Sequence, residues 1–189
     1  MPELCFITTC MGRLAHLQQT LGRLVSQAHS SCIVVDYSCA EQCGKWVEQT
    51  YPQAKVIRVP GERYFRLSDA RNVGAASADA PWLCLVDADV RLDPRFAEAV
   101  LPLLQPGFYL RANPWSKGLW GTVICTRQDF DKVDGYDEVF QGWGAEDDEF
   151  YGRLNWLGLK LKGFPASLLE QLTHSDDLRC KTMLPRISS

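Results

Sequence analysis

One stretch decides how this 189-residue chain is organised: Gln141-Gly142-Trp143-Gly144-Ala145-Glu146-Asp147-Asp148-Glu149-Phe150. Four consecutive carboxylates repel one another, and a fold tolerates them where the run is solvated or where it binds a positive or hydroxylic group. Phe150, Leu154 and Leu157 follow at helical spacing, so the acids are expected to open a helix. Acids in a first helical turn also have a purely structural explanation, because the free N–H groups and the helix dipole favour negative charge there.

A second stretch upstream favours a functional interpretation of the acids. Leu83-Cys84-Leu85-Val86-Asp87-Ala88-Asp89 is an apolar strand that ends in two aspartates. In α/β proteins ligands bind beyond the carboxyl ends of the strands, and two further predicted strands end there in Thr8-Thr9 and in Asp36. Asp36 alone is equally well explained as a turn residue that caps the next element.

The remaining pattern predicts an α/β fold. Apolar runs at 4–9, 32–38, 54–59 and 82–86 read as strands, and helices are expected at 13–27, 68–76 and 94–104. This alternation indicates a mainly parallel, twisted sheet flanked by helices. Further along, strands are expected at 108–110, 121–126 and 159–162, with a helix at 128–133. We predict a single domain over 1–180, with halves 1–105 and 106–180, and a tail at 181–189.

Composition excludes some classes of protein. The chain is 46% hydrophobic, which suffices for one good core, and its net charge of −3 argues against a nucleic-acid partner. No apolar run approaches the roughly 20 residues of a membrane span, and no signal-peptide pattern opens the chain. Four of the eight cysteines, Cys5, Cys32, Cys84 and Cys125, lie in apolar runs, as small buried hydrophobes do, so we expect a cytoplasmic protein with reduced thiols. Cys39 and Cys43 are close in sequence, but no second pair with zinc spacing accompanies them, and their role stays open.

The two acidic stretches suit a hard cation. Mg²⁺ and Mn²⁺ prefer oxygen ligands and often use only one or two carboxylates together with substrate phosphates. An Asp-x-Asp such as Asp87-Ala88-Asp89 is weak by itself, but it gains weight after an apolar strand and with a second acidic cluster downstream. A calcium loop fails on spacing, since neither stretch has alternating acids followed by glycine and a distant glutamate.

These residues resemble those of GT-A-type (nucleotide-diphospho-sugar transferase) glycosyltransferases. The first half is similar to family 2, through Asp36, the segment 70–74 (Ala-Arg-Asn-Val-Gly) and Asp87-Ala88-Asp89. The second half is similar to the C-terminal region of the β-1,4-galactosyltransferases, through the motifs at 134–136 and 142–148, Arg153-Leu154 and His174-Ser175. The Trp-Gly-x-Glu-Asp-Asp motif is the most specific of these. Two departures are Ala145, where the family has a second glycine, and Gln171, where vertebrate members place a methionine ligand.

The resemblance implies a role for each candidate residue. Nucleotide-sugar binding falls to Thr8, Arg13, Asp36, Arg71 and Asp87, and acceptor binding to Trp143, Glu146 and Asp148. Asp89 and His174 would bind Mn²⁺ or Mg²⁺, and Asp147 would be the general base. The implied activity is metal-dependent, inverting transfer of a hexose from a UDP-sugar to a hydroxyl of a saccharide or other acceptor.

Several alternatives stay open at this stage. A sugar nucleotidyltransferase shares the α/β logic but needs a glycine-rich loop after its first strand, where this chain has only Gly12. A non-catalytic sugar-binding subunit would keep the fold without the chemistry. Arg71 is explained equally by pairing with Asp69 or Asp87 and by contact with donor phosphate, and Trp115 and Trp120 line an acceptor groove or simply cap the core. Galactose, glucose and N-acetylhexosamine donors, and any oligomeric state, are compatible with the sequence.

Overall fold

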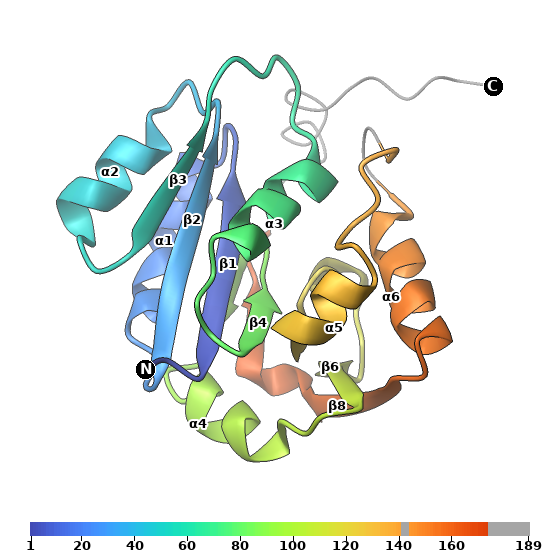
Figure 1. Ribbon diagram of the computed structural model, residues 1–189. Coiled ribbons are helices and arrows are strands. Elements are labelled where there is room, and N and C mark those ends of the chain that lie inside the picture. Colours follow the sequence, from blue (N-terminus) through green and yellow to red (C-terminus); the bar gives the residue numbers. More distant parts are fainter. Residues whose placement is uncertain (141–143, 174–189) are drawn as a thin grey trace.

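The computed structural model describes residues 1–140 and 144–173. Strands and helices alternate through the first half of the chain (Figure 1). The strands are β1 (Leu4–Cys10), β2 (Ser30–Tyr37), β3 (Lys55–Val59), β4 (Trp82–Leu85), β5 (Val90–Leu92), β6 (Phe108–Asn113), β7 (Val123–Thr126), β8 (Lys160–Pro165) and β9 (Leu169–Gln171). The α-helices are α1 (Leu14–Val25), α2 (Cys43–Thr50), α3 (Leu67–Ala76), α4 (Phe96–Val100), α5 (Arg127–Lys132) and α6 (Glu146–Trp156).

Seven strands form the main sheet in the order β3-β2-β1-β4-β7-β6-β8. The first four in this order run parallel, β7 runs antiparallel to both of its neighbours, and β6 and β8 pair in parallel. Every residue of β1 is buried, as expected for a central parallel strand that reads as one continuous apolar run. The prediction of a mainly parallel sheet flanked by helices is therefore confirmed.

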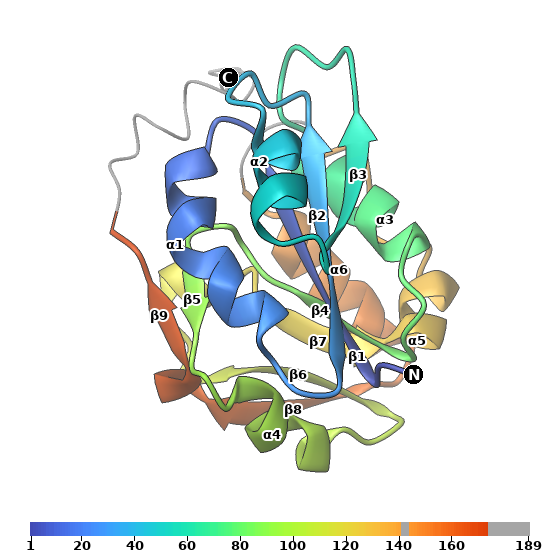
Figure 2. The same cartoon turned by 90° about the vertical axis from the view of Figure 1, so that its left-hand side faces the viewer.

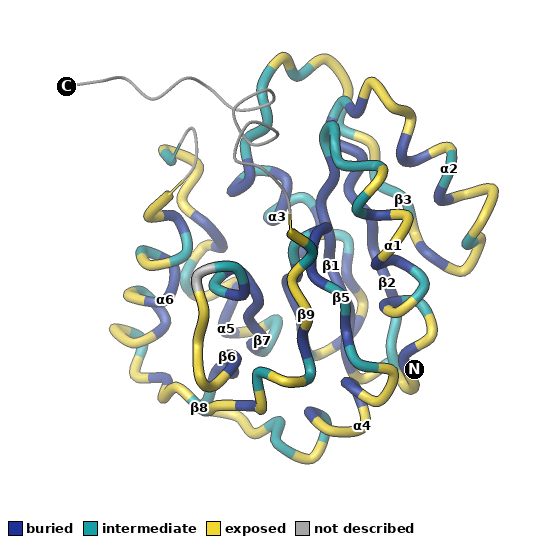
Figure 3. Tube along the Cα trace, turned by 180° about the vertical axis from the view of Figure 1, so that it is seen from behind, coloured by how far each residue is buried: buried dark blue, intermediate teal, exposed yellow. Residues whose placement is uncertain are grey.

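Helices cover the sheet on both faces, which makes three layers (Figure 2). Alternate residues of β1 point to opposite faces, so Phe6 packs with Leu17 of α1 and Phe96 of α4, whereas Ile7 packs on the other side with Ala70 of α3. The helices α5 and α6 complete the second face, where the apolar side of α6 contributes Phe150. The buried strands lie between more exposed helices, as Figure 3 shows.

Helix α3 lies unusually close to the sheet because its residues are small. A methyl group built on Gly74 would come within 2.4 Å of the Ile7 side chain and 3.0 Å of the Val35 side chain. Only hydrogen fits at this position of the helix. The helix predicted at 68–76 is thus present, and its close approach to the sheet brings Arg71 of α3 to the carboxyl end of β4.

We predict that Gly74→Ala lowers the free energy of unfolding by about 1–3 kcal/mol, because the added methyl overpacks the core against Ile7. Gly152→Ala is the matched control, since no atom lies within 4 Å of a methyl group built at that exposed position of α6. Alanine there should stabilise the helix by roughly 0.5–1 kcal/mol. Urea denaturation measures both changes, and a Gly74→Ala protein as stable as the parent would contradict the close packing.

One local prediction is corrected, and two features of the fold were not predicted. The helix expected at 94–104 is α4 followed by a separate 3-10 turn, Leu101–Leu103, because Pro102 has no N–H to donate to a continuing α-helix. Helix α2 was not expected, since its short apolar face consists of Cys43 and Val47. A small second sheet was also missed: β5 pairs antiparallel with β9, and three residues each are too few for a periodic signal.

Candidate functional site

The two aspartates that follow β4 lie in a tight turn at the carboxyl edge of the sheet. The N–H of Val90 donates to the Asp87 carbonyl at 3.0 Å, and the Thr20 hydroxyl of α1 donates to the Ala88 carbonyl at 2.9 Å. The side chain of Asp87 is 34% exposed and Asp89 is buried. Burial, together with the charges of Asp89 and Asp147, raises the pKa of Asp87, and the Arg71 guanidinium opposes that shift.

Arg71 joins this turn to the acidic helix. Its side chain is only 3% exposed, and its guanidinium donates to Asp87 at 2.9 Å and to Asp147 at 2.6 Å. A methyl group on Gly121 would lie 2.6 Å from both Arg71 and Asp87, so this glycine leaves room for the pair. Asp69, the other partner considered for Arg71, pairs with Arg66 instead.

Asp147 lies in the first turn of α6, as the sequence predicted for the acids. Its Oδ1 atom accepts from Arg71 and, at 3.1 Å, from the hydroxyl of Tyr136. Burial raises the pKa of Tyr136 well above its ordinary value, so the hydroxyl stays protonated and donates. No residue in the described part of the chain donates a hydrogen bond to Oδ2 of Asp147.

The turn before α6 has a left-handed backbone at Ala145. Ala145 adopts φ 72° and ψ −16°, the left-handed region in which a side chain costs about 1–2 kcal/mol relative to the right-handed one. Gly144, at φ 113°, precedes it, and its N–H donates to Glu146 at 2.8 Å. This chain therefore keeps the turn geometry at some cost in strain where Ala145 replaces the second glycine.

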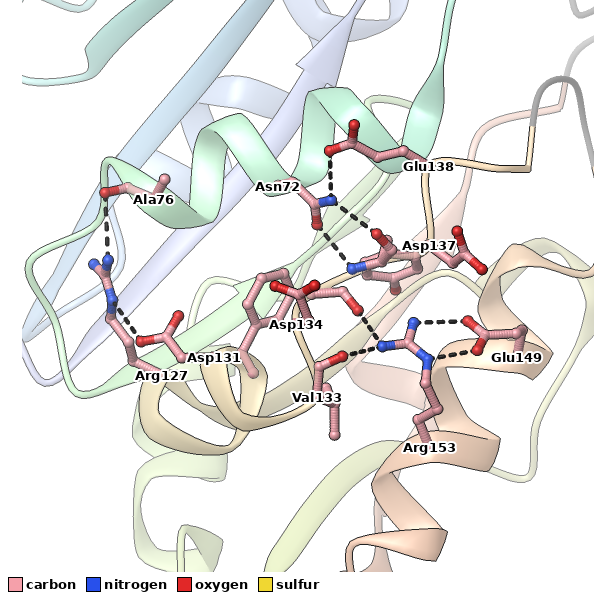
Figure 4. Close-up of a pocket in the computed structure, with 13 residues that line it drawn as sticks. Asn72, Ala76, Arg127, Asp131, Val133, Asp134, Asp137, Glu138, Glu149 and Arg153 are labelled. Atoms are coloured by element: carbon pink, nitrogen blue, oxygen red, sulfur yellow. Dashed lines mark hydrogen bonds and ion pairs between the residues drawn. The ribbon is translucent and has the colours of Figure 1, made fainter.

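Tyr136 and the turn before it are held by Asn72 and Arg153, two motif residues for which the sequence predicted no individual role. The Asn72 side chain both donates to the Tyr136 carbonyl and accepts from its N–H, each at 2.8 Å. The Arg153 guanidinium donates to the carbonyls of Val133 and Gly135 and pairs with Glu149 (Figure 4). These groups line a cavity of about 890 Å³ between α3, α5 and α6. The cavity does not contain Asp87, Asp89 or Asp147, so we assign the Asn72 and Arg153 contacts to support of Tyr136.

The two acids on either side of Asp147 have different surroundings. Glu146 is 4% exposed, and burial raises the pKa of its carboxyl group above the ordinary value. Asp148 is exposed, and its Oδ1 accepts the indole N–H of Trp120 at 2.9 Å. Only Asp148 of these two therefore presents its carboxylate openly to solvent.

Trp120 is positioned by an aromatic and cationic cluster that sequence reasoning missed. The Arg111 guanidinium lies 3.6 Å from the ring centroid of Trp120 and 3.9 Å from that of Tyr151. The Tyr151 hydroxyl donates to the Trp120 carbonyl at 2.6 Å. Trp115, 66% exposed, meets Trp120 edge to face with centroids 4.9 Å apart. In the sequence, the two nearby tryptophans were the only sign of this cluster. They were equally compatible with an acceptor groove and with a cap on the core.

The predicted nucleotide-binding residues lie at the carboxyl ends of β1 and β2. The Asp36 carboxylate accepts the N–H groups of Cys39 at 3.0 Å and of Gly44 at 3.1 Å, so it caps the turn and the start of α2. Thr8 is buried, and its hydroxyl has no partner among the described residues. Arg13 caps the start of α1 by its backbone, at the end of the loop that follows β1. These residues lie at the carboxyl edge of the sheet, and their contact with a nucleotide stays a prediction.

Two predicted site residues, Trp143 and His174, lie outside the described residues, as does the tail at 181–189. The chain that leads to His174 runs beside the Asp87–Asp89 turn. Strand β9 pairs with β5, and the N–H of Leu172 donates to the Asp89 carbonyl at 2.8 Å. Gln171 lies against Gly118, where a methyl group would overlap its side-chain amide.

Comparison with known proteins identifies the class of protein to which this chain belongs. The fold is that of solved GT-A glycosyltransferases. Residues 5–110 match the model of glycosyl transferase family 2, and residues 109–177 match that of the N-terminal domain of galactosyltransferase. The chain belongs to glycosyl transferase family 2, which argues against the nucleotidyltransferase alternative.

Curated relatives match over part of their length. Human β-1,4-galactosyltransferase 3 is 29% identical over 126 residues, covering 60% of this chain and 32% of the relative. Mouse β-1,4-galactosyltransferase 2 is 28% identical over 123 residues, covering 56% of this chain and 32% of the relative. This chain thus spans about a third of the length of these relatives.

Solved structures agree on the fold at low sequence identity. S. aureus TarS 1–349 in complex with UDP superposes with a TM-score of 0.76 at 15% identity, covering 94% of this chain and 62% of that one. The mannosyltransferase PcManGT from Pyrobaculum calidifontis, in complex with GDP-Man and Mn²⁺, gives 0.69 at 15% identity, covering 87% and 55%. Among the residues that the structure describes, no helix has both the length and the apolar character that crossing a bilayer requires.

Proposed function

We propose that this chain is a metal-dependent inverting glycosyltransferase that moves a hexose from a UDP-sugar to an acceptor hydroxyl. One observation carries the proposal: Arg71, buried between two elements, holds Asp87 of the donor side and Asp147 of the acidic helix in one cluster. The two acidic stretches recognised in the sequence therefore belong to one site. Matches to two glycosyltransferase family models support the reaction class.

The chemistry assigned to Asp147 follows from its hydrogen bonds. Arg71 and Tyr136 orient the carboxylate through Oδ1, which leaves Oδ2 for the hydroxyl of the acceptor. As that hydroxyl oxygen attacks the anomeric carbon, its proton passes to Oδ2 and the bond from the anomeric carbon to the diphosphate oxygen breaks. UDP leaves on the opposite face from the attack, so an α-linked donor gives a β-glycoside.

The residues that follow β4 fit a hard divalent cation. Asp87 and Asp89 supply carboxylate oxygens to a turn in which Arg71 is, among the described residues, the one cation paired with Asp87 and Asp147, so added positive charge would be favourable there. When bound, Mn²⁺ or Mg²⁺ would stabilise the negative charge of the leaving diphosphate. We propose Asp89 and His174 as its ligands. The hydrogen bond from Leu172 to Asp89 supports this, because His174 follows only two residues later.

The substrate-binding roles stay proposals for the same site. Donor binding is assigned to Thr8, Arg13, Asp36 and Asp87, and acceptor binding to Trp143, Glu146 and Asp148. We assign Arg71 to positioning the two carboxylates, and its direct contact with donor phosphate stays a prediction. The exposed ring of Trp115, beside Trp120 and Asp148, supports a saccharide acceptor, because sugars stack on aromatic faces while carboxylates accept their hydroxyls. The cytoplasmic location also stays a prediction.

We predict that UDP binds more tightly with Mn²⁺ or Mg²⁺ than with a chelator, and that Asp89→Ala weakens binding by roughly 10-fold or more. The physical reason is the loss of a carboxylate that would hold the ion and so help to neutralise the charge of the diphosphate. Calorimetric titration of UDP, with and without manganese, measures both effects. Asp79→Ala is the matched control, because Asp79 is an exposed aspartate before the amino end of β4.

Transfer itself is tested with a panel of UDP-sugars and simple saccharide acceptors in manganese. A glycoside product of inverted configuration supports the proposal, and equal UDP binding in chelator and in manganese would contradict the metal assignment. Metal-dependent UDP binding without transfer or donor hydrolysis across the panel would favour the non-catalytic sugar-binding alternative.

A further inference from the structure

Three cysteines come together at the carboxyl edge of the sheet. Cys10 ends β1, Cys39 lies in the loop after β2, and Cys43 begins α2 (Figure 1). Their sulfur atoms all lie within 4.8 Å of one another, and all three residues are buried. Among the described residues, no other group of three or more His, Cys, Asp or Glu side chains has its potential ligand atoms this close together.

We propose that Cys10, Cys39 and Cys43 form a three-thiolate site for a thiophilic divalent ion such as Zn²⁺. Thiolates bind zinc at about 2.3 Å, which puts two sulfur atoms on one ion about 3.8–4.0 Å apart. The observed separations therefore need to shorten by less than about 1 Å. Each thiol that becomes a ligand releases its proton to solvent, and the filled site carries one net negative charge.

The contacts around the sulfur atoms are those of a ligand cluster. The N–H of Gly12 donates to the Cys39 sulfur at 3.4 Å, as an outer partner of a metal thiolate does, and the Cys43 thiol donates to the Cys10 carbonyl at 3.8 Å.

The backbone is arranged to hold this loop in place. Ser38 and Gln42 both adopt positive φ values, 49° and 55°, in the left-handed region that side chains rarely occupy. The Asp36 carboxylate accepts the N–H groups of Cys39 and of Gly44, which flank the loop on both sides. Such strain persists only where the surroundings over-determine it, and local strain collects at ligand sites.

The hard ion proposed at Asp89 and the soft ion proposed here do not compete. Oxygen ligands select manganese or magnesium, whereas thiolates select zinc and its heavier relatives. This cluster is not built from two closely spaced cysteine pairs, as many zinc sites are. Its third cysteine, Cys10, comes from the end of β1. In the sequence, only Cys39 and Cys43 lie close enough together to suggest a pair.

Cadmium titration tests the proposal without any sugar substrate. In a Cys180→Ser background, with a phosphine reductant, one equivalent of Cd²⁺ should give ultraviolet thiolate-to-metal charge-transfer absorption and raise the melting temperature. Cys10→Ser, Cys39→Ser and Cys43→Ser should each weaken binding by at least the roughly 10–100-fold that loss of an outer partner costs. Cys32→Ala, which removes a buried thiol outside the cluster, should bind like the parent.

A second measurement covers variants that fail to fold. In the parent protein, stoichiometric Cd²⁺ or Zn²⁺ should slow alkylation of Cys39, read by mass spectrometry of peptides, while Mn²⁺ should not. Absence of charge transfer at one equivalent, or a band that survives in all three serine variants, would overturn the proposal. So would a disulfide within the cluster that excludes the ion in protein purified without reductant. None of these results depends on glycosyl transfer, so failure here is distinguishable from failure of the proposed function.

Discussion

Asp147→Asn should lower the rate of sugar transfer by on the order of 10²–10⁴-fold, the usual contribution of a positioned general base. The amide is nearly isosteric with the carboxylate, and its oxygen still accepts from Arg71 and Tyr136 at the start of α6. Folding and UDP binding should therefore change little, whereas the acceptor hydroxyl loses the base that would accept its proton. Turnover at saturating donor, together with the melting temperature and UDP affinity, measures the effect.

The neighbouring acids provide the controls for that result. Asp148→Asn keeps the Trp120 contact to Oδ1 and should act mainly by raising KM for the acceptor, as loss of uniform binding does. Glu146→Gln removes a buried carboxyl group and should likewise spare the chemical step. If instead all three variants lose only up to about 1 kcal/mol of stability and transfer normally per folded molecule, the acids merely open a helix.

Arg71→Met should destabilise the fold by roughly 3–5 kcal/mol, because it leaves the Asp87 and Asp147 carboxylates together without their shared cation. Methionine keeps much of the apolar stem, so lost packing contributes little. For a chain of this size the melting temperature should fall by about 2–4 °C for each kcal/mol. Denaturant unfolding gives the free energy, and Arg71→Met with Asp147→Asn should recover part of it, since one charge is removed.

Arg58→Met is the matched control for the Arg71 variant. Arg58 pairs with Glu48 at 2.7 Å, a distance like those of Arg71, but both side chains are 49% exposed. Solvent screens exposed ion pairs strongly, so the control should change stability only slightly. If Arg71→Met lowers the free energy of unfolding no more than Arg58→Met does, the Arg71 guanidinium does not hold the two carboxylates together. The proposed function would then lose the observation on which it rests.

The alternation of strands and helices followed from local patterns. Continuous apolar runs predicted β1, β2, β3 and β4, because strands buried on both faces consist mainly of apolar residues, and the helical spacing of leucines predicted α1. The acids at the start of α6 and the small residues of α3 were likewise visible, and both were observed. Short elements without a periodic signal, such as α2 and β9, were not predictable in this way.

By itself, then, the sequence determined the α/β class, the carboxyl edge at which Asp87 and Asp89 lie, and the helix that begins with Asp147. Only the tertiary structure decided the partners: Arg71 bonds to Asp147, 76 residues away, and Cys10 meets Cys43 across 33 residues. Such contacts depend on which loops close and which faces pack, and any buried carboxylate would have satisfied Arg71 equally well. Local spacing therefore identifies the groups, while the chain's topology determines which of them act together.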